Sequence, residues 1–250
     1  MWIYNGEMDW HARYIQQAGW TAQLRSFLFK QAGVFSASRV LDLGCGTGAI
    51  LAELGSQAGV YGLDLDFDML CHSTRHAPSA LLTCADAGSL PYKRAAFEAA
   101  FCHFVLLWVP DPLRVVSEMR RVTRVGGAVL ALAEPDYAGR IDYPLELAES
   151  GRWQAEALHS QGVDMLMGRK LAATFSRAGL RHIETGVIGG QWRGAPTSSQ
   201  FELEWQTLMS DLGGRVAPEQ LQELRALDQH AWQTGERVLY VPTFYAWGVV

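Results

Sequence analysis

One segment of the chain constrains its fold more than any other. Residues 40–48 read VLDLGCGTG, an apolar stretch that contains one acid and leads into three alternating glycines. This pattern predicts a buried strand that enters a tight loop. Glycine tolerates positive φ and lets a ligand come close to the backbone, so we expect the loop to hold a small molecule.

Strand-like and helix-like segments alternate on both sides of this loop. In the first part of the chain we expect strands at 39–43, 60–63, 80–84, 97–102 and 128–133, and helices at 9–31, 49–57, 67–75 and 112–123. After Pro135 we expect helices at 145–160, 169–178, 198–212 and 218–234, and strands at 182–188 and 238–249. Strands joined by helices of this length imply right-handed parallel crossovers and a sheet covered on both faces.

Composition narrows the possible classes of protein. The net charge is −5 over 250 residues and no basic stripe is visible, which argues against a nucleic-acid partner. The longest apolar stretch, around 99–109, is too short to span a bilayer, and the N-terminus shows no secretory signal. Four irregularly spaced cysteines predict reduced thiols in a cytoplasmic protein and no metal site: Cys45, Cys71, Cys84 and Cys102.

The glycine loop alone is ambiguous, because it also fits a dinucleotide-binding fingerprint with Asp64 at the ribose-binding spacing. Two further acids favour another ligand. Asp42 lies in the first strand and Asp86 follows the third, so with Asp64 they should meet at the carboxyl edge of a parallel sheet. Three carboxylates would repel a pyrophosphate but suit a sulfonium, an ammonium and a ribose diol, as in S-adenosylmethionine.

A family resemblance supports this ligand. VLDLGCGTG, YGLDLDFDML, CADAGSLPY, FEAAFCHFVLLWVPDP and EMRRVTRVGGAVLALAEPDY follow one another from about residue 39 to 136. In order and spacing they resemble the class I S-adenosylmethionine-dependent methyltransferase family. The resemblance implies a Rossmann-like α/β fold with a seven-stranded, mostly parallel sheet and an antiparallel last strand.

The resemblance also implies roles for individual residues in holding S-adenosylmethionine and its product S-adenosylhomocysteine. The loop backbone should approach the methionyl part, Asp42 its ammonium, and Asp64 both ribose hydroxyls. The adenine should pack between apolar side chains, with an acid and an amide at its edge. The full set of expected contacts is Asp42, Gly44, Cys45, Gly46, Asp64, Leu65, Met69, Asp86, Ala87, Cys102 and His103.

We interpret residues 1–250 as one domain, with a cofactor-binding half at 34–136. A helix precedes the sheet, and the helical segments 137–180 and 193–236 are expected to form a cap over the substrate. A dimerisation or packing element is the alternative for these segments. The sequence does not indicate an oligomeric state.

The methyl acceptor is less constrained. His103 and Glu134 follow the fourth and fifth strands and are our candidates for a general base, although His103 also fits a purely packing role. No NPPY-type tetrapeptide follows the fourth strand, which favours a small-molecule acceptor at oxygen, nitrogen or carbon. The alternatives are an RNA or protein methyltransferase, an NAD-dependent oxidoreductase, and a non-catalytic S-adenosylmethionine-binding protein.

Overall fold

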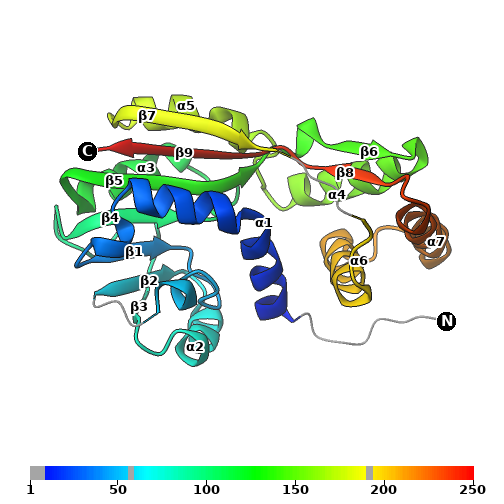
Figure 1. Ribbon diagram of the computed structural model, residues 1–250, viewed down its shortest axis with the longest axis horizontal. Coiled ribbons are helices and arrows are strands. Elements are labelled where there is room, and N and C mark those ends of the chain that lie inside the picture. Colours follow the sequence, from blue (N-terminus) through cyan, green and yellow to red (C-terminus); the bar gives the residue numbers. More distant parts are fainter. Residues whose placement is uncertain (1–8, 56–58, 190–193) are drawn as a thin grey trace.

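The computed structural model describes residues 9–55, 59–189 and 194–250 and is built around a seven-stranded sheet with the order β3-β2-β1-β4-β5-β9-β7 (Figure 1). Strand β9 runs antiparallel to both of its neighbours, and the neighbouring strands from β3 to β5 pair in parallel. The expected fold class, including the antiparallel last strand, is therefore confirmed. The strands of this sheet are β1 (Val40–Leu43), β2 (Val60–Asp64), β3 (Leu81–Cys84), β4 (Phe97–Cys102), β5 (Thr123–Pro135), β7 (Arg181–Ile188) and β9 (Thr243–Val249).

Helices cover both faces of the sheet. Helix α1 (Trp10–Gln31) and helix α2 (Phe67–His76) share one apolar core with Val40, while α3 (Pro112–Val122) and α5 (Met167–Arg177) share another with Leu41. Neighbouring residues of β1 thus face opposite cores, as the two-residue period of a strand requires.

Local sequence explains where several helices begin and end. Asp66 caps α2 by accepting hydrogen bonds from the amides of Asp68 and Met69, and Asp111 caps α3 with Pro112 at its first position. A capping box starts α6 (Ser198–Leu212), and Gly213 ends it in a left-handed conformation.

Several expected elements differ in the structure: β5 begins at Thr123 and not at residue 128, and the segment expected as one helix at 145–160 starts with a 3-10 turn before α4 (Ala148–Ser160). Two other segments differ in kind or continuity. The helix expected at 49–57 is a short 3-10 turn, η2 (Leu51–Leu54), which ends at Gly55 with a φ of 59°; residues 56 and 57 lie outside the described part. The strand expected at 238–249 is divided into β8 (Val238–Tyr240) and β9, with Pro242 between them. A proline has no amide hydrogen to donate to a sheet, so the pairing stops there.

A small helical subdomain extends from one end of the sheet (Figure 1). It consists of α4 (Ala148–Ser160), α6, α7 (Pro218–Thr234) and the two-stranded sheet of β6 (Ile141–Tyr143) with β8. The subdomain has a separate apolar core, which includes Trp205. Helix α5, which the sequence placed in the cap segment 137–180, packs instead against β5, β7 and β9. Near the subdomain two short 3-10 turns, η3 (Tyr137–Gly139) and η4 (Leu145–Leu147), flank β6.

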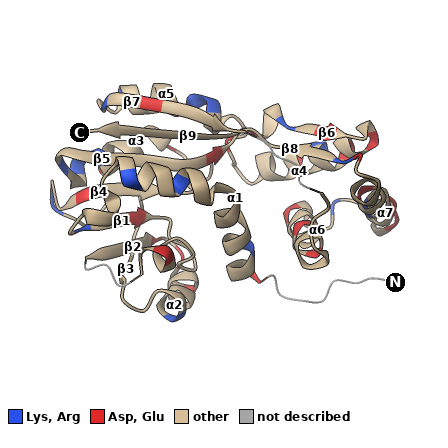
Figure 2. Cartoon of the chain, viewed as in Figure 1, with Lys and Arg blue, Asp and Glu red and all other residues tan. Residues whose placement is uncertain are grey.

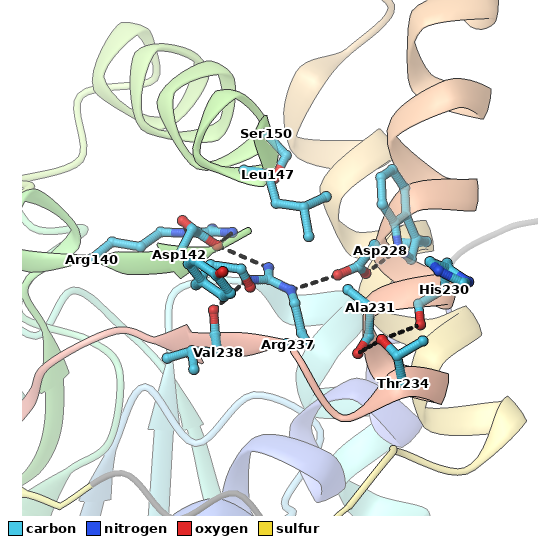
Figure 3. A network of polar contacts seen from close by, with 12 residues as sticks. Arg140, Asp142, Leu147, Ser150, Asp228, His230, Ala231, Thr234, Arg237 and Val238 are labelled. Carbon is cyan, nitrogen blue, oxygen red and sulfur yellow. Dashed lines mark hydrogen bonds and ion pairs between the residues drawn. The ribbon is translucent and has the colours of Figure 1, made fainter. Parts of the chain in front are cut away.

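A buried ion-pair network joins the elements of this subdomain (Figure 3). The Arg237 guanidinium donates to Asp228 on α7 at 2.6 Å and to Asp142 on β6 at 2.8 Å. Asp142 also accepts from Arg140, and Asp228 accepts from the indole of Trp205 on α6. Because every carboxylate has a donor, the network connects β6, α6 and α7 without leaving a buried charge unpaired.

Among the residues that the structure describes, no helix has both the length and the apolar character needed to cross a membrane.

Candidate functional site

A cavity of about 960 Å³ opens at the carboxyl edge of the sheet and continues toward the helical subdomain. Its sheet side is formed by the glycine loop and by residues that follow β2, β3 and β4. Helix α1 contributes one wall, with Trp10, Arg13, Tyr14 and Gln17. Helices α4 and α6 line the far end, with Gln154, Leu158, Gln161, Thr207, Ser210 and Asp211.

Three positions of the loop favour glycine, because Gly44, Gly46 and Gly48 all have positive φ. A Cβ on Gly44 would lie 2.4 Å from the Cγ2 of Val105, and one on Gly46 would lie 2.8 Å from the Cε2 of Tyr14. Both residues have positive φ, 66° and 52°. The amides of Gly44 and Cys45 donate to the carbonyl of Leu63, which ties the loop to the end of β2.

All three predicted acids line the cavity. Asp64 accepts hydrogen bonds from the amides of Gly46 at 2.7 Å and Asp66 at 3.0 Å, one on each oxygen. Asp42 is 1% exposed and its Oδ2 has no hydrogen-bond partner in the described part of the chain. Burial, together with the nearby Asp64 carboxylate, raises the pKa of Asp42 well above its ordinary value. Asp86 is exposed and accepts from the amide of Gly88.

Comparison with known proteins agrees with this geometry. The family model described as "Methyltransferase domain" matches residues 41–131, which span the glycine loop and all three acids. Residues 41–131 form a methyltransferase domain of the class I S-adenosylmethionine-dependent type.

Two relatives of the chain carry names that differ in how much they say about function. It is 31% identical over 211 residues to an uncharacterized 37.1 kDa protein in transposon TN4556 of Streptomyces fradiae, covering 79% of this chain and 60% of that one. It is 33% identical over 141 residues to trans-aconitate 2-methyltransferase of Rhizobium etli, covering 54% of each chain. Thus the chain spans about half to three fifths of the length of these relatives.

Among solved structures, the [4+2]-cyclase SpnF has a similar fold, with a TM-score of 0.56 and 18% sequence identity, covering 91% of this chain and 80% of that one. At that identity the likeness concerns the fold alone.

Most of the other residues expected at the cofactor also line this cavity. Its lining includes Gly44, Cys45, Gly46, Leu65, Met69, Ala87 and His103. Leu65 is 73% exposed, so its side chain is accessible to a ligand in the cavity. Cys102 is the exception, because its side chain is fully buried in the core that β1 shares with α3.

The His103 imidazole reaches the cavity from the end of β4 but is held by α1. Its Nε2 lies 2.9 Å from the hydroxyl of Thr21. Burial, with the Arg25 cation nearby, lowers the pKa of His103 to about 3. A base of this strength is poorly matched to proton abstraction near neutral pH.

Glu134 has a different environment from the one its position after β5 indicated. Its carboxylate accepts hydrogen bonds from the amides of Val105, Leu106 and Leu107, at 2.9–3.1 Å. The residue is fully buried, and burial raises its pKa to about 7 although the three backbone donors lower it. The Glu134 side chain therefore holds the turn after β4, and it is not among the residues that line the cavity.

The far end of the cavity carries polar residues that the sequence did not indicate. Arg13 donates through Nη1 to Glu204 on α6 at 2.8 Å, while its Nε is buried without a partner in the described residues. Gln154 on α4 donates to the Asp211 carboxylate on α6 at 2.7 Å. These residues come from three helices far apart in the sequence, so no local motif could have connected them.

Proposed function

We propose that the protein is an S-adenosylmethionine-dependent methyltransferase that acts on a small-molecule acceptor. The single observation that carries this proposal is the cavity itself, which is lined by three carboxylates and the glycine loop at the sheet and by helices α1, α4 and α6 elsewhere. A methyltransferase needs room for an acceptor beside the cofactor, because it must align a nucleophile with the methyl group and exclude water.

The residues present fit the cofactor. The unpartnered Oδ2 of buried Asp42 suits an ammonium group, which would supply the missing hydrogen bond. Each oxygen of Asp64 already accepts one backbone bond and keeps lone pairs for the two hydroxyls of a ribose. The glycine loop leaves room for a ligand at the backbone. Bound there, the cofactor would supply the activated methyl group.

We assign the adenine to the exposed edge of the cavity. Leu65 and Met69 offer apolar contact to its ring, and Asp86 with the amide of Ala87 offers polar contact to its edge. In this assignment the loop residues Gly44, Cys45 and Gly46 approach the methionyl part, and His103 forms a wall as a neutral imidazole.

The size of the cavity favours a small acceptor. Its volume of about 960 Å³ is near the upper limit of the usual range for small-molecule sites. The Arg13–Glu204 ion pair joins α1 to α6 over this space, so we propose that the helical subdomain forms the acceptor cap. The name of the Rhizobium etli relative states a small acceptor, which supports the same class.

Calorimetric titration with S-adenosylmethionine, S-adenosylhomocysteine and NADH tests the cofactor. We expect both adenosyl ligands to bind and NADH not to bind, and the D64A variant to lose at least about tenfold in affinity. The matched control is D68A, because Asp68 is exposed on α2 and does not line the cavity. Binding of NADH alone, or equal affinities in D64A and D68A, would refute the assignment.

A further inference from the structure

The charges around the cavity select for cations. Its lining includes the carboxylates of Asp42, Asp64, Asp66, Asp86, Asp111 and Asp211, against the guanidinium groups of Arg13 and Arg114. Three of these carboxylates, Asp42, Asp64 and Asp86, are assigned to the cofactor, and the other three outnumber the two guanidinium groups by one. A partly enclosed cavity of one sign concentrates ligands of the opposite sign and repels those of its own. Figure 2 shows Lys and Arg residues both on the elements around the seven-stranded sheet and on the helical subdomain.

At the far end of the cavity, the Asp211 carboxylate forms no ion pair with a described residue. Arg13 is already matched by Glu204, at 2.8 Å. Asp211 is held by a neutral partner, the side-chain amide of Gln154, on its Oδ2 at 2.7 Å. No hydrogen bond to the other oxygen, Oδ1, occurs among the residues that the structure describes, and Asp211 lines the cavity. Oδ1 is therefore open to a ligand.

The orientation of the Gln154 amide follows from its second partner. The Arg140 guanidinium has only donors, so the Gln154 oxygen must face it, and the two groups are 2.8 Å apart. The amide nitrogen then has to point at Asp211. Arg140 is in turn fixed by Asp142, which Arg237 also holds. This chain of contacts reaches from the buried network of Figure 3 to the cavity and holds Asp211 in one position.

The charged and titratable groups near Asp211 belong to several elements. Arg13 on α1 favours its ionised form, whereas burial and Glu204 on α6 oppose it. Burial is the largest influence, and the pKa of Asp211 lies above its ordinary value. Tyr137 also lines the cavity, and burial raises its pKa to about 12, so it stays neutral.

We propose that the methyl acceptor is a small amine and that Asp211 takes the proton from its nitrogen. This inference rests on the proposed methyltransferase function. The acidic cavity admits the acceptor as an ammonium ion, which Asp211 binds through Oδ1. One N–H bond breaks, its proton goes to Oδ1, and its electrons stay on nitrogen as the attacking lone pair. That pair forms the N–CH₃ bond while the S–CH₃ bond breaks and leaves its electrons on sulfur. Asp211 then releases its proton to solvent.

The experiment compares acceptors of the same shape and opposite charge. Benzylamine, 2-phenylethylamine and ethanolamine are titrated against benzoate, 3-phenylpropionate and glycolate, with protein saturated by S-adenosylhomocysteine. Wild type should bind at least one amine, and each amine it binds at least about tenfold more tightly than its matched carboxylate. D211N should lose about tenfold in amine affinity. It should also lose at least about a hundredfold in methyl transfer to any amine that wild type methylates.

The control is E202Q, which removes a carboxylate from the same helix at a position outside the cavity lining. It should behave as wild type toward the amines. For an amine that is methylated, kcat/KM of wild type should rise with pH as Asp211 ionises, and D211N should lose that limb.

Three results would overturn the inference: tighter binding of the carboxylates, binding of none of the amines, or unchanged amine affinity or transfer in D211N. A failure of the proposed function gives another result, because S-adenosylhomocysteine would then not bind to wild type at all.

Discussion

Replacing Arg237 by alanine should destabilise the helical subdomain strongly. The side chain is only 2% exposed, and its two carboxylate partners, Asp142 and Asp228, are 3% and 11% exposed. It also donates to the backbone oxygen of Val238. Among the residues that the structure describes, the remaining donors would then be the indole of Trp205 for Asp228 and Arg140 for Asp142.

The magnitude follows from this burial. Removing one partner of a buried ion pair leaves an uncompensated charge and costs about 3–5 kcal/mol. An exposed pair is worth well under 1 kcal/mol. Arg152 offers the matched control, because it pairs with Glu149 on the exposed side of α4, where the two side chains are 62% and 47% exposed. R152A should therefore shift the free energy of unfolding by about 0.5 kcal/mol or less.

Urea denaturation followed by tryptophan fluorescence measures both variants, since Trp205 reports on the network directly. We expect the transition of R237A at much lower urea than that of R152A. A double variant, R237M/D228N, removes the Arg237–Asp228 pair and leaves Asp142 paired with Arg140, so it should recover part of the loss. An R237A variant within 1 kcal/mol of wild type would refute the reasoning, because the carboxylates would then have found other partners or water.

Two further perturbations test the packing at the glycine loop and the state of the buried histidine. A Cβ on Gly62 would lie 2.7 Å from Leu51 and 2.9 Å from both Cys45 and Leu82, so G62A should cost about 1–3 kcal/mol in thermal or urea unfolding. G19A is its control, because no atom of the described residues lies within 4 Å of a Cβ at that position. An equal loss in both variants would contradict the overpacking argument. Burial lowers the pKa of His103 from 6.5 to about 3, so between these values the unfolded chain binds a proton that the folded chain does not. This contribution to stability is present above pH 6.5 and is lost as the pH falls toward 3. Between pH 6.5 and pH 5 the free energy of unfolding should fall by about 1.5 kcal/mol from this source. Urea titrations of H103Q at the two pH values should lack this difference.

The sheet end of the cavity could be predicted because its residues lie close to strand ends. Asp42, Asp64 and Asp86 belong to or follow β1, β2 and β3, which pair in parallel as neighbours. The rule that such ends share one edge is enough to bring the three acids together. The same rule was less reliable for Glu134 in β5. Glu134 is near the end of β5, but the turn after β4 leaves three buried amides to satisfy, and Glu134 accepts from them.

The end of the cavity near the helical subdomain could not be predicted in this way. Arg13, Gln154 and Asp211 lie on α1, α4 and α6, and their meeting depends on how the subdomain packs against the sheet. Helical spacing in the sequence indicates which residues share a face of one helix, but it does not indicate which helices meet. The kind of acceptor is for this reason a question about tertiary packing, and the resemblance over residues 39–136 could not address it.

Helix α1 connects the two ends of the cavity, and this bears on how the acceptor meets the cofactor. Tyr14 lies against Gly46 of the glycine loop, close enough that a Cβ there would overlap its ring. One residue earlier, Arg13 pairs with Glu204 on α6. Successive residues of a helix point about 100° apart, so one rigid turn contacts the cofactor loop and the subdomain together. The same turn of α1 therefore positions the glycine loop and the subdomain relative to each other.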